Sequence, residues 1–262
     1  MADDPSGGTV KSRREGAAAV LTLSYPERRN AFSLSLRAVL LTALEEAMAD
    51  DACRVVVITG EGGHFCSGGD ISSFDGITSV SGRARMKRAH PIVRLIIQGE
   101  KPVIAAVEGH AAGAGLCLAA ACDIVVAARN AKFSCTFNKI GLFPDLGGSW
   151  TLPQRMGLGR ARMLMLTGGV LDAESAERQG LVEFVTAPGE ALTAALALAE
   201  TLANTAPLSN AFVKAALARA PVSLEAALAA EADAQGLLYG SEDVQEGRRA
   251  FLEKRPPKFV GR

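Results

Sequence analysis

Short apolar runs alternate with helical patterns over about the first 130 residues, and this alternation restricts the chain to few folds. Four runs of apolar, often β-branched residues predict buried strands, at 18–24, 54–59, 103–107 and 123–128. Residues 34–49 and 83–98 carry the spacing of helices, and Ser33 is suited to cap the first of them. After about residue 155 strands become scarce and helical segments dominate. The sequence therefore predicts an α/β core followed by an α-helical C-terminal region.

Size and charge exclude several classes of protein. The 262 residues are 48% hydrophobic, which suits one large domain with a sizeable core. Lysine plus arginine and aspartate plus glutamate number 28 each, so the formal net charge is zero. A protein that binds nucleic acid usually shows a basic excess, so no nucleic-acid partner is expected. Aromatic residues are only 5% while glycines number 27, which predicts closely approaching backbones and tight turns.

The chain shows no signal for export, membrane insertion or metal binding. Its start, MADDPSGG, is acidic and lacks the pattern of a signal peptide. The longest uncharged stretch, 109–122, is shorter than the roughly 20 apolar residues that a membrane span needs. The five cysteines lack zinc-finger spacing, and the three histidines lie far apart. We therefore expect a cytoplasmic protein with no membrane association, no bound metal and reduced, buried thiols.

Two glycine-rich loops follow predicted strands and are candidates for ligand binding. The first, 60–70, is dense enough in glycine to bring main-chain N–H groups close to a ligand. A flexible turn is the alternative, although Phe65 and Cys66 inside the loop favour an anchored one. The second, 108–119, passes from glycines into a helix, whose N-terminus can stabilise an oxyanion. Close helix packing is the alternative here, and neither loop carries a Walker or dinucleotide signature.

A third loop, 140–150, contains Pro144-Asp145-Leu146-Gly147. By itself this pattern is ordinary turn chemistry, because aspartate bonds readily to nearby main-chain groups. In their order and spacing, however, the three loops together resemble the crotonase (enoyl-CoA hydratase/isomerase) superfamily over nearly the whole chain. Further matching segments are Asn30-Ala31, 107–109, 122–124, 157–161, 176–182 and 246–255.

The resemblance implies a fold, an assembly and a class of substrate. The fold would be a crotonase-like spiral of ββα units over residues 1–200. A helical C-terminal region, 201–262, would serve in trimerisation, giving a homotrimer or a hexamer built as a dimer of trimers. The substrate would be an acyl-CoA thioester. No separate cofactor is expected, because coenzyme A is part of the substrate.

The resemblance also implies which groups act on the substrate. The main-chain N–H groups of Gly69 and Ala114 would hold the thioester oxygen as it becomes negative. Hydratases of this superfamily use two glutamates, but their positions here are Cys117 and Phe137. In isomerases of the phenylacetate-pathway type, the pattern Gly-Leu-x-Pro-Asp-x-Gly-Gly places the catalytic aspartate at Asp145.

An aspartate in this sequence context is expected to have a raised pKa. The residues expected to surround Asp145 are Phe137, Leu142, Phe143 and Trp150. Burial among such side chains disfavours the charged carboxylate, which brings the group closer to a working base.

Further residues are predicted to bind the substrate, namely Ser67, Gly68, Asp70, Ile71, Phe137, Leu142, Arg28 and Lys254. Arg28 and Lys254 would meet the phosphates of coenzyme A, the latter on a neighbouring subunit, with solvated surface side chains as the alternative. Asp70 is expected to order its loop rather than to transfer protons. The basic stretch 83–94 either flanks the acyl pocket or forms a solvated helix face, and the second is expected.

The preferred hypothesis is an enoyl-CoA isomerase that moves a double bond from position 3 to position 2, with Asp145 as the acid and base. One carboxylate suffices for that reaction, since it removes a proton from C2 and returns it to C4. The alternatives are a hydratase that uses another group, a thioester hydrolase, and a dehalogenase-like enzyme in which the aspartate attacks carbon. A CoA-ester-binding pseudoenzyme is an alternative of a different class.

Overall fold

The computed structural model describes residues 7–219 and 223–262; residues 1–6 of the acidic start and a short piece of the predicted C-terminal region, 220–222, lie outside them. A six-stranded sheet forms the centre in the order β1-β2-β3-β4-β6-β9. Its strands are β1 (Thr9–Glu15), β2 (Ala18–Ser24), β3 (Val55–Gly60), β4 (Val103–Val107), β6 (Ile124–Ala128) and β9 (Phe184–Thr186). β1 is antiparallel to β2 and the other pairs are parallel. The predicted α/β class is confirmed.

A second, three-stranded sheet gives the chain a repeated strand–strand–helix organisation. It contains β5 (His110–Ala112), β7 (Lys132–Ser134) and β8 (Val170–Asp172). β4 lies in the large sheet, β5 in the small one, and α3 (Ala114–Ala121) follows. β6 and β7 repeat this order before α4 (Gly148–Met156). Because each unit crosses between sheets, the loops at these crossings gather beside one another.

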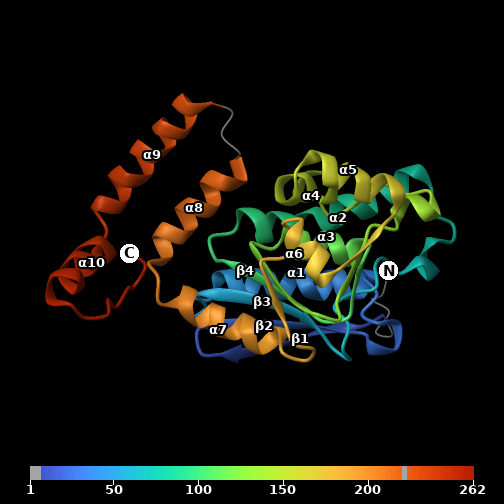
Figure 1. Cartoon of the computed structure of the whole chain (residues 1–262), viewed down its shortest axis with the longest axis horizontal. Helices are drawn as coiled ribbons and strands as arrows, with labels where there is room; N and C mark the ends of the chain where they lie inside the picture. Colours follow the sequence, from blue (N-terminus) through green and yellow to red (C-terminus); the bar gives the residue numbers. More distant parts are fainter. Residues whose placement is uncertain (1–6, 220–222) are drawn as a thin grey trace.

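Helices cover both faces of the large sheet, which explains why its central strands, β2, β3, β4 and β6, are mostly apolar. One face packs against α1 (Leu34–Ala49), α2 (Ser79–Gln98) and α3, and the other packs against α7 (Ala191–Ala203). In β3, Val56 and Ile58 belong to the first layer, while Val55 and Val57 belong to the second. Figure 1 shows α7 lying across the sheet on its own side. The remaining helices of the core are η1 (Pro26–Arg28), η2 (Ile71–Phe74), η3 (Phe137–Ile140), α5 (Leu158–Thr167) and α6 (Ala173–Arg178).

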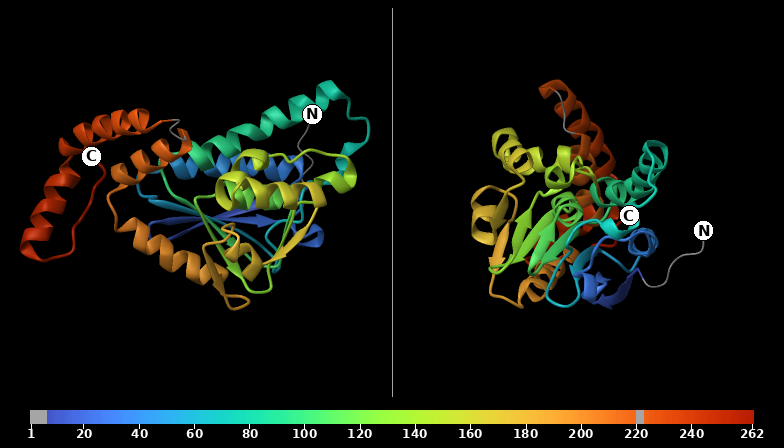
Figure 2. Two further views of the ribbon diagram at one scale, coloured as in Figure 1. Left: turned by 45° about the horizontal axis from the view of Figure 1, so that its top comes forward. Right: turned by 90° about the vertical axis from the view of Figure 1, so that its right-hand side faces the viewer.

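Three helices form a C-terminal arm beside this core, namely α8 (Pro207–Arg219), α9 (Leu224–Tyr239) and α10 (Glu242–Glu253). The arm stands apart from the sheet in Figure 1 and in the left view of Figure 2. Lys214 of α8 fastens it: its ammonium donates to the carbonyls of Ile96 and Lys101, at 2.9 Å each, and pairs with Asp123. A buried lysine is therefore fully satisfied at this junction.

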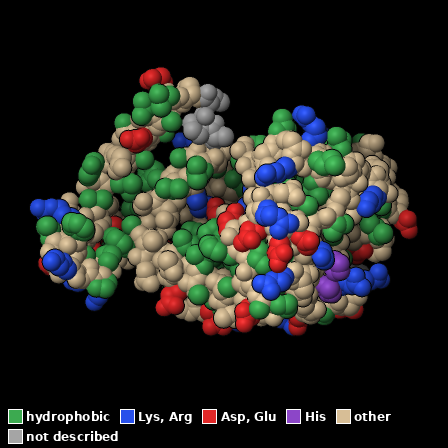
Figure 3. All heavy atoms as spheres, viewed as in Figure 1, with side chains coloured by type: hydrophobic (Ala, Val, Ile, Leu, Met, Phe, Trp, Pro, Cys, Tyr) green, Lys and Arg blue, Asp and Glu red, His purple; other side chains and the backbone are tan. Residues whose placement is uncertain are grey.

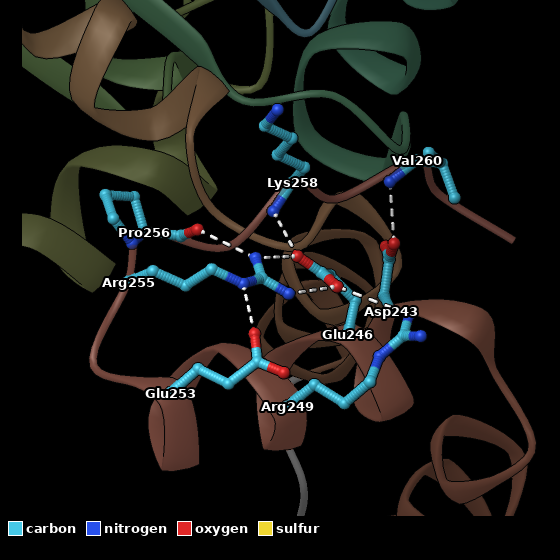
Figure 4. A network of polar contacts seen from close by, with 8 residues as sticks. All are labelled: Asp243, Glu246, Arg249, Glu253, Arg255, Pro256, Lys258 and Val260. Carbon is cyan, nitrogen blue, oxygen red and sulfur yellow. Dashed lines mark hydrogen bonds and ion pairs between the residues drawn. The ribbon is translucent and has the colours of Figure 1, made fainter.

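The chain end folds back on α10 through a polar network. Figure 4 shows Glu246 accepting hydrogen bonds from the guanidinium of Arg255, at 2.6 and 3.0 Å, and from the Lys258 main chain. Arg255 thereby lowers the pKa of Glu246 to about 2. Asp243, which is buried, accepts the N–H groups of Val260 and Gly261. These contacts hold the tail without an apolar core of its own.

The short strands β5, β7 and β8 and the helix α4 were not predicted, and two further differences have clear reasons. β1 was not predicted, because this edge strand is largely charged and only Val10 is buried. α2 begins at Ser79 rather than near Arg83, because Thr78 and Ser81 cap it reciprocally. The five cysteines are free and buried, as predicted. In the described residues, no helix is both long and apolar enough to cross a membrane.

Candidate active site

A cavity of about 990 Å³ lies between the loop after β3, the start of α3, α2 and the segment that joins η3 to α4. All but one of the predicted site residues line this cavity. Those that do are Arg28, Ser67, Gly68, Gly69, Asp70, Ile71, Ala114, Phe137, Leu142 and Asp145. The exception is Lys254, which ends α10 in the C-terminal arm and does not line the cavity. Its predicted contact, across a subunit boundary, stays a prediction.

Main-chain hydrogen bonds join the first two glycine-rich loops. The N–H of Cys66 donates to the carbonyl of His110, and the N–H of Ala112 donates to the carbonyl of Cys66, both at 2.9 Å. Gly68 has a φ of +110°, and a Cβ there would stand 3.1 Å from the Ala112 carbonyl. A Cβ at Gly115 would stand 2.3 Å from the Cys66 carbonyl. Glycine is required at these places because the two backbones approach so closely.

This approach brings two main-chain donors to one cavity. Gly69 follows Gly68, and Ala114 is the first residue of α3, after Gly113 at a φ of +49°. Among the described residues, neither N–H group has a hydrogen-bond acceptor. Ala114 also lies at the positive end of the helix dipole. Two unpaired donors on one cavity are suited to hold an oxygen that gains negative charge.

Asp145 faces this cavity from the loop before α4. Its main-chain carbonyl accepts the N–H of Gly148 at 2.8 Å, which closes the turn. Its Oδ1 is buried and has no hydrogen-bond partner among the described residues. Burial raises the pKa of this carboxyl group, and the nearby positive charge of Arg37 opposes that shift only in part. The neighbours differ from those expected, because Trp150 is 42% exposed and does not line the cavity.

Sequence reasoning missed two buried arginines on the cavity wall. Arg37 of α1 and Arg85 of α2 are only 7% and 6% exposed. The expectation of a solvated face for 83–94 is therefore wrong at Arg85. A signal was present, because Arg85 lies on the same helical stripe as the buried Ala89 and Ile92. Its basic neighbours in the sequence hid this periodicity.

Comparison with known proteins identifies the family. Residues 13–262 match the enoyl-CoA hydratase/isomerase family. The chain belongs to this family. It is 39% identical over 258 residues to the 1,2-epoxyphenylacetyl-CoA isomerase of Escherichia coli K12, covering 97% of this chain and 98% of the relative. It is 40% identical over 257 residues to a probable enoyl-CoA hydratase of Rhodobacter capsulatus, with the same coverage.

A solved structure confirms the crotonase-like fold. The crystal structure of an enoyl-CoA hydratase from Polaromonas sp. JS666 superposes with a TM-score of 0.92. It is 39% identical and the match covers 96% of this chain and 100% of that one. The chain is thus an acyl-CoA-processing enzyme of the crotonase family. Its relatives carry the names of both isomerases and hydratases, so the family leaves the reaction open.

The two positions that the resemblance assigned to hydratase glutamates hold no carboxylate. Cys117 is fully buried in α3, and a Cβ added to Gly148 would stand 2.3 Å from its sulfur. Burial raises the pKa of this thiol well above its usual value, so it is protonated at neutral pH. Phe137 presents an aromatic ring to the cavity instead. Asp70 caps η2 by accepting the N–H and the hydroxyl of Ser72 at its Oδ1.

Proposed function

We propose that this member of the family is an enoyl-CoA isomerase that converts 3-enoyl-CoA to 2-enoyl-CoA. One observation carries the proposal: Asp145 has a buried oxygen with no hydrogen-bond partner in the described residues, while the other cavity carboxylate, Asp70, accepts hydrogen bonds from Ser72. A single proton carrier matches isomerisation, which neither consumes nor releases water. The relative named 1,2-epoxyphenylacetyl-CoA isomerase supports an isomerase among several chemistries of the family.

The proposed reaction uses three groups that line the cavity. The thioester oxygen accepts the N–H groups of Gly69 and Ala114, which acidifies the C2–H bond. Asp145 takes the C2 proton, and the electron pair spreads over a dienolate that ends on the thioester oxygen. The same carboxyl group then gives its proton to C4, and the double bond closes between C2 and C3. The raised pKa of Asp145 favours proton removal, because a carboxylate with a higher pKa is a stronger base towards the C2 proton.

Hydration is the main alternative, since a relative is named as a probable enoyl-CoA hydratase. That reaction needs one group to activate water and another to protonate the α-carbon. The residues at the two expected positions, Cys117 and Phe137, provide neither function. The Phe137 ring lines the cavity near Gly113, where a Cβ would stand 3.8 Å from its Cζ, and it offers no polar atom to an attacking water.

Replacing Asp145 by asparagine tests the proposal directly. We expect the rate of 3-enoyl-CoA isomerisation to fall by about 10²–10⁴, because asparagine accepts no proton. The matched control is Asp75→Asn, an exposed aspartate that does not line the cavity, which should keep the wild-type rate. Near-wild-type turnover in Asp145→Asn would show that Asp145 is not the acid and base of the reaction.

The same assay separates the remaining chemistries. Oxygen from labelled water at C3 of the product would identify a hydratase. A covalent ester trapped on Asp145 would identify hydrolase-like or dehalogenase-like attack on carbon. Binding of CoA esters without any turnover, across 2-enoyl and 3-enoyl substrates, would identify a pseudoenzyme.

We also propose that the enzyme works as a homotrimer or as a hexamer of two trimers. The C-terminal arm carries exposed apolar side chains, namely Val213, Leu217, Leu224, Leu228, Leu237, Tyr239, Phe251 and Leu252. Figure 3 shows hydrophobic side chains along the arm, with charged ones among them. Apolar patches of this kind mark interfaces. In such an assembly, Lys254 and the core residue Arg28 would contact the phosphates of coenzyme A. Light scattering of the purified enzyme measures the number of subunits and tests the proposed assembly.

A further inference from the structure

The cavity holds an unusual set of unsatisfied polar atoms. In the described residues, the buried side-chain nitrogen and oxygen atoms without a hydrogen-bond partner are Arg37 Nη1, Arg85 Nε, Arg85 Nη2 and Asp145 Oδ1. All belong to residues that line this one cavity. Leaving a buried charged donor unpaired costs more than leaving a neutral one. The isomerisation mechanism uses Asp145 but gives no task to either buried cation.

Arg37 is fastened to the main chain that carries the Gly69 N–H group. Its Nε donates to the carbonyl of Phe32 at 3.1 Å, and its guanidinium lies over the Phe32 ring, 5.0 Å from the centre. The N–H of Phe32 donates in turn to the carbonyl of Gly68 at 2.7 Å, and Phe32 pairs with Gly69 in an isolated parallel bridge. These contacts fix the place of the guanidinium relative to Gly69.

The Arg37 guanidinium lies beside the proposed thioester site. A Cβ at Gly69 would stand 3.8 Å from Arg37 Nη2, and no other atom of the described residues outside 68–70 would lie within 4 Å of it. Ala114, the second proposed donor, lines the same cavity. Because Arg37 is buried, water screens its charge only weakly. A negative charge on the thioester oxygen would therefore interact strongly with this cation.

The same cation also acts on the proposed base. Burial raises the pKa of Asp145, and the charge of Arg37 is the largest effect that opposes this rise. Burial lowers the pKa of Arg37 in turn, and the charge of Asp145 is the largest effect that opposes this fall. Burial also lowers the pKa of Arg85, but there the largest opposing charge is that of Asp70. Arg37 is thus the arginine that acts on the base and lies beside the thioester site.

Isomerisation moves one negative charge back and forth between these two places. The Asp145 carboxylate takes the C2 proton and becomes neutral, while the electron pair of the C–H bond leaves the charge on the thioester oxygen. When the carboxyl group gives the proton to C4, the charge returns to Asp145. Only one of the two anions exists at a time, so one fixed cation can stabilise both without rearrangement of the protein.

We propose that Arg37 stabilises the oxygen of the dienolate as well as the carboxylate of Asp145. The proposal deepens the proposed function and rests on it for the dienolate. The main-chain N–H groups of Gly69 and Ala114 hold the thioester oxygen in place, and Arg37 adds a full positive charge beside it. Arg85 contributes less to this anion.

The enolate of a bound 3-oxoacyl-CoA tests the proposal. 3-Oxobutanoyl-CoA has no double bond to move, but it loses its acidic C2 proton to give an enolate that absorbs in the near ultraviolet. The absorbance of its fully bound complex is titrated against pH in Asp145→Asn, where no carboxylate at this position competes for Arg37. We expect Arg37→Met, added to this parent, to lower the ratio of enolate to keto form about tenfold or more at a given pH.

Further variants in the same parent separate charge from structure. Arg83→Met, an exposed arginine of α2 that does not line the cavity, should keep the enolate ratio of the parent. Arg37→Lys keeps the positive charge, and it should lose less enolate than Arg37→Met does. Arg85→Met should also lose less. Arg37→Gln, which is neutral as well, replaces Arg37→Met if that variant does not fold.

A control ligand separates the enolate from the neutral thioester. Butanoyl-CoA lacks the acidic C2 proton of the 3-oxo compound, and Arg37→Met should bind it within about twofold of the parent by calorimetry. A loss of butanoyl-CoA affinity as large as the loss of enolate would overturn the proposal. So would an unchanged enolate ratio in Arg37→Met, an equal fall in Arg83→Met or Arg85→Met, or a fall in Arg37→Lys as large as in Arg37→Met.

The test is distinct from that of the isomerase assignment. A 3-oxo thioester ionises through its own acidity and without Asp145, so the enolate is measured whichever reaction the enzyme catalyses. If Arg37 fails this test while Asp145→Asn loses isomerisation, the proposed reaction stands and the role of Arg37 is wrong. If Asp145→Asn isomerises normally while the enolate depends on Arg37, the proposed function fails and the cation at the thioester site remains.

Discussion

The molecule buries cationic side chains in two regions and treats them differently. At the junction of the C-terminal arm and the core, Lys214 has two carbonyl acceptors and a carboxylate partner. On the cavity wall, Arg37 and Arg85 are equally buried but keep nitrogen atoms that have no hydrogen-bond partner within the described part of the chain. The first arrangement stabilises the fold, since the ammonium contacts are complete. The second costs stability, because the charges of Asp145 and Asp70 compensate the desolvation of those guanidinium groups only in part.

This difference indicates which buried polar groups are available to bind a ligand. A buried charge whose hydrogen bonds are all made stabilises the fold, and its loss should lower the free energy of unfolding without changing the catalysed reaction. An unsatisfied donor that faces a cavity is prepared for a substrate atom, and its loss should change the chemistry with little effect on the fold. Three substitutions test this contrast.

The largest effect is expected at a main-chain donor of the cavity. Ala114→Pro removes the N–H group at the first position of α3, a position that tolerates proline without loss of the helix. Loss of one oxyanion donor should lower kcat by about 10²–10³, or roughly 3–4 kcal/mol, while the free energy of unfolding stays within about 1 kcal/mol. Steady-state kinetics and urea unfolding measure the two quantities.

The control for this substitution is Ala114→Gly, which retains the N–H group. It should keep kcat within a few-fold of wild type. If Ala114→Pro isomerises 3-enoyl-CoA as fast as Ala114→Gly does, the main-chain N–H of Ala114 does not hold the thioester oxygen.

The opposite pattern is expected at the arm. Lys214→Met removes three contacts and leaves Asp123 without its cation, although that carboxylate keeps 28% of its surface exposed. The free energy of unfolding should fall by about 2–3 kcal/mol in urea titrations, while kcat/KM of the folded enzyme stays unchanged. Lys87→Met, an exposed lysine of α2, should stay within about 0.5 kcal/mol. A large loss of kcat/KM in Lys214→Met would remove the contrast between the two regions.

The smallest effect is a shift in pH dependence. Asp145 must be ionised to take a proton, and burial raises its pKa, so kcat/KM should decline on the acid side at a higher pH than for an ordinary aspartate. Arg37 favours the ionised form, so Arg37→Met should raise that pKa further and move the acid limb to higher pH. Arg83→Met should leave the limb in place. A pH–rate profile that is unmoved in Arg37→Met would show that Arg37 has no electrostatic effect on the base.

Much of the fold was predictable because its signals are local. The buried strands at 18–24 and 103–107 were predicted with the bounds that they have, since uniform apolar runs leave little choice of structure. Ser33 caps α1 as predicted, because capping depends on a few neighbouring residues. β1 was missed, as a charged edge strand depends on its pairing with β2 rather than on its own pattern.

The candidate site was predictable only where a motif marks it. Gly69, Ala114 and Asp145 were identified through loop motifs and their order, and all three line one cavity. Arg37 and Arg85 carry no motif, and the second stands in a basic run typical of a solvated helix. Their roles depend on which face of α1 and α2 packs inward, beside a loop from elsewhere in the chain.

The sequence by itself determined the α/β class, the family and the aspartate on which the proposed chemistry depends, because strand runs and glycine-rich turns act over short distances. Only the tertiary structure decided that two buried guanidinium groups share the cavity with that aspartate, and that Lys214 is satisfied while they are not. Burial and hydrogen-bond satisfaction are properties of the packed molecule, since the groups that meet at each site come from distant segments. The formal net charge of the chain is zero, yet the buried cations of the two regions differ: Lys214 pairs with Asp123, whereas Arg37 and Arg85 keep unpaired nitrogen atoms among the described residues.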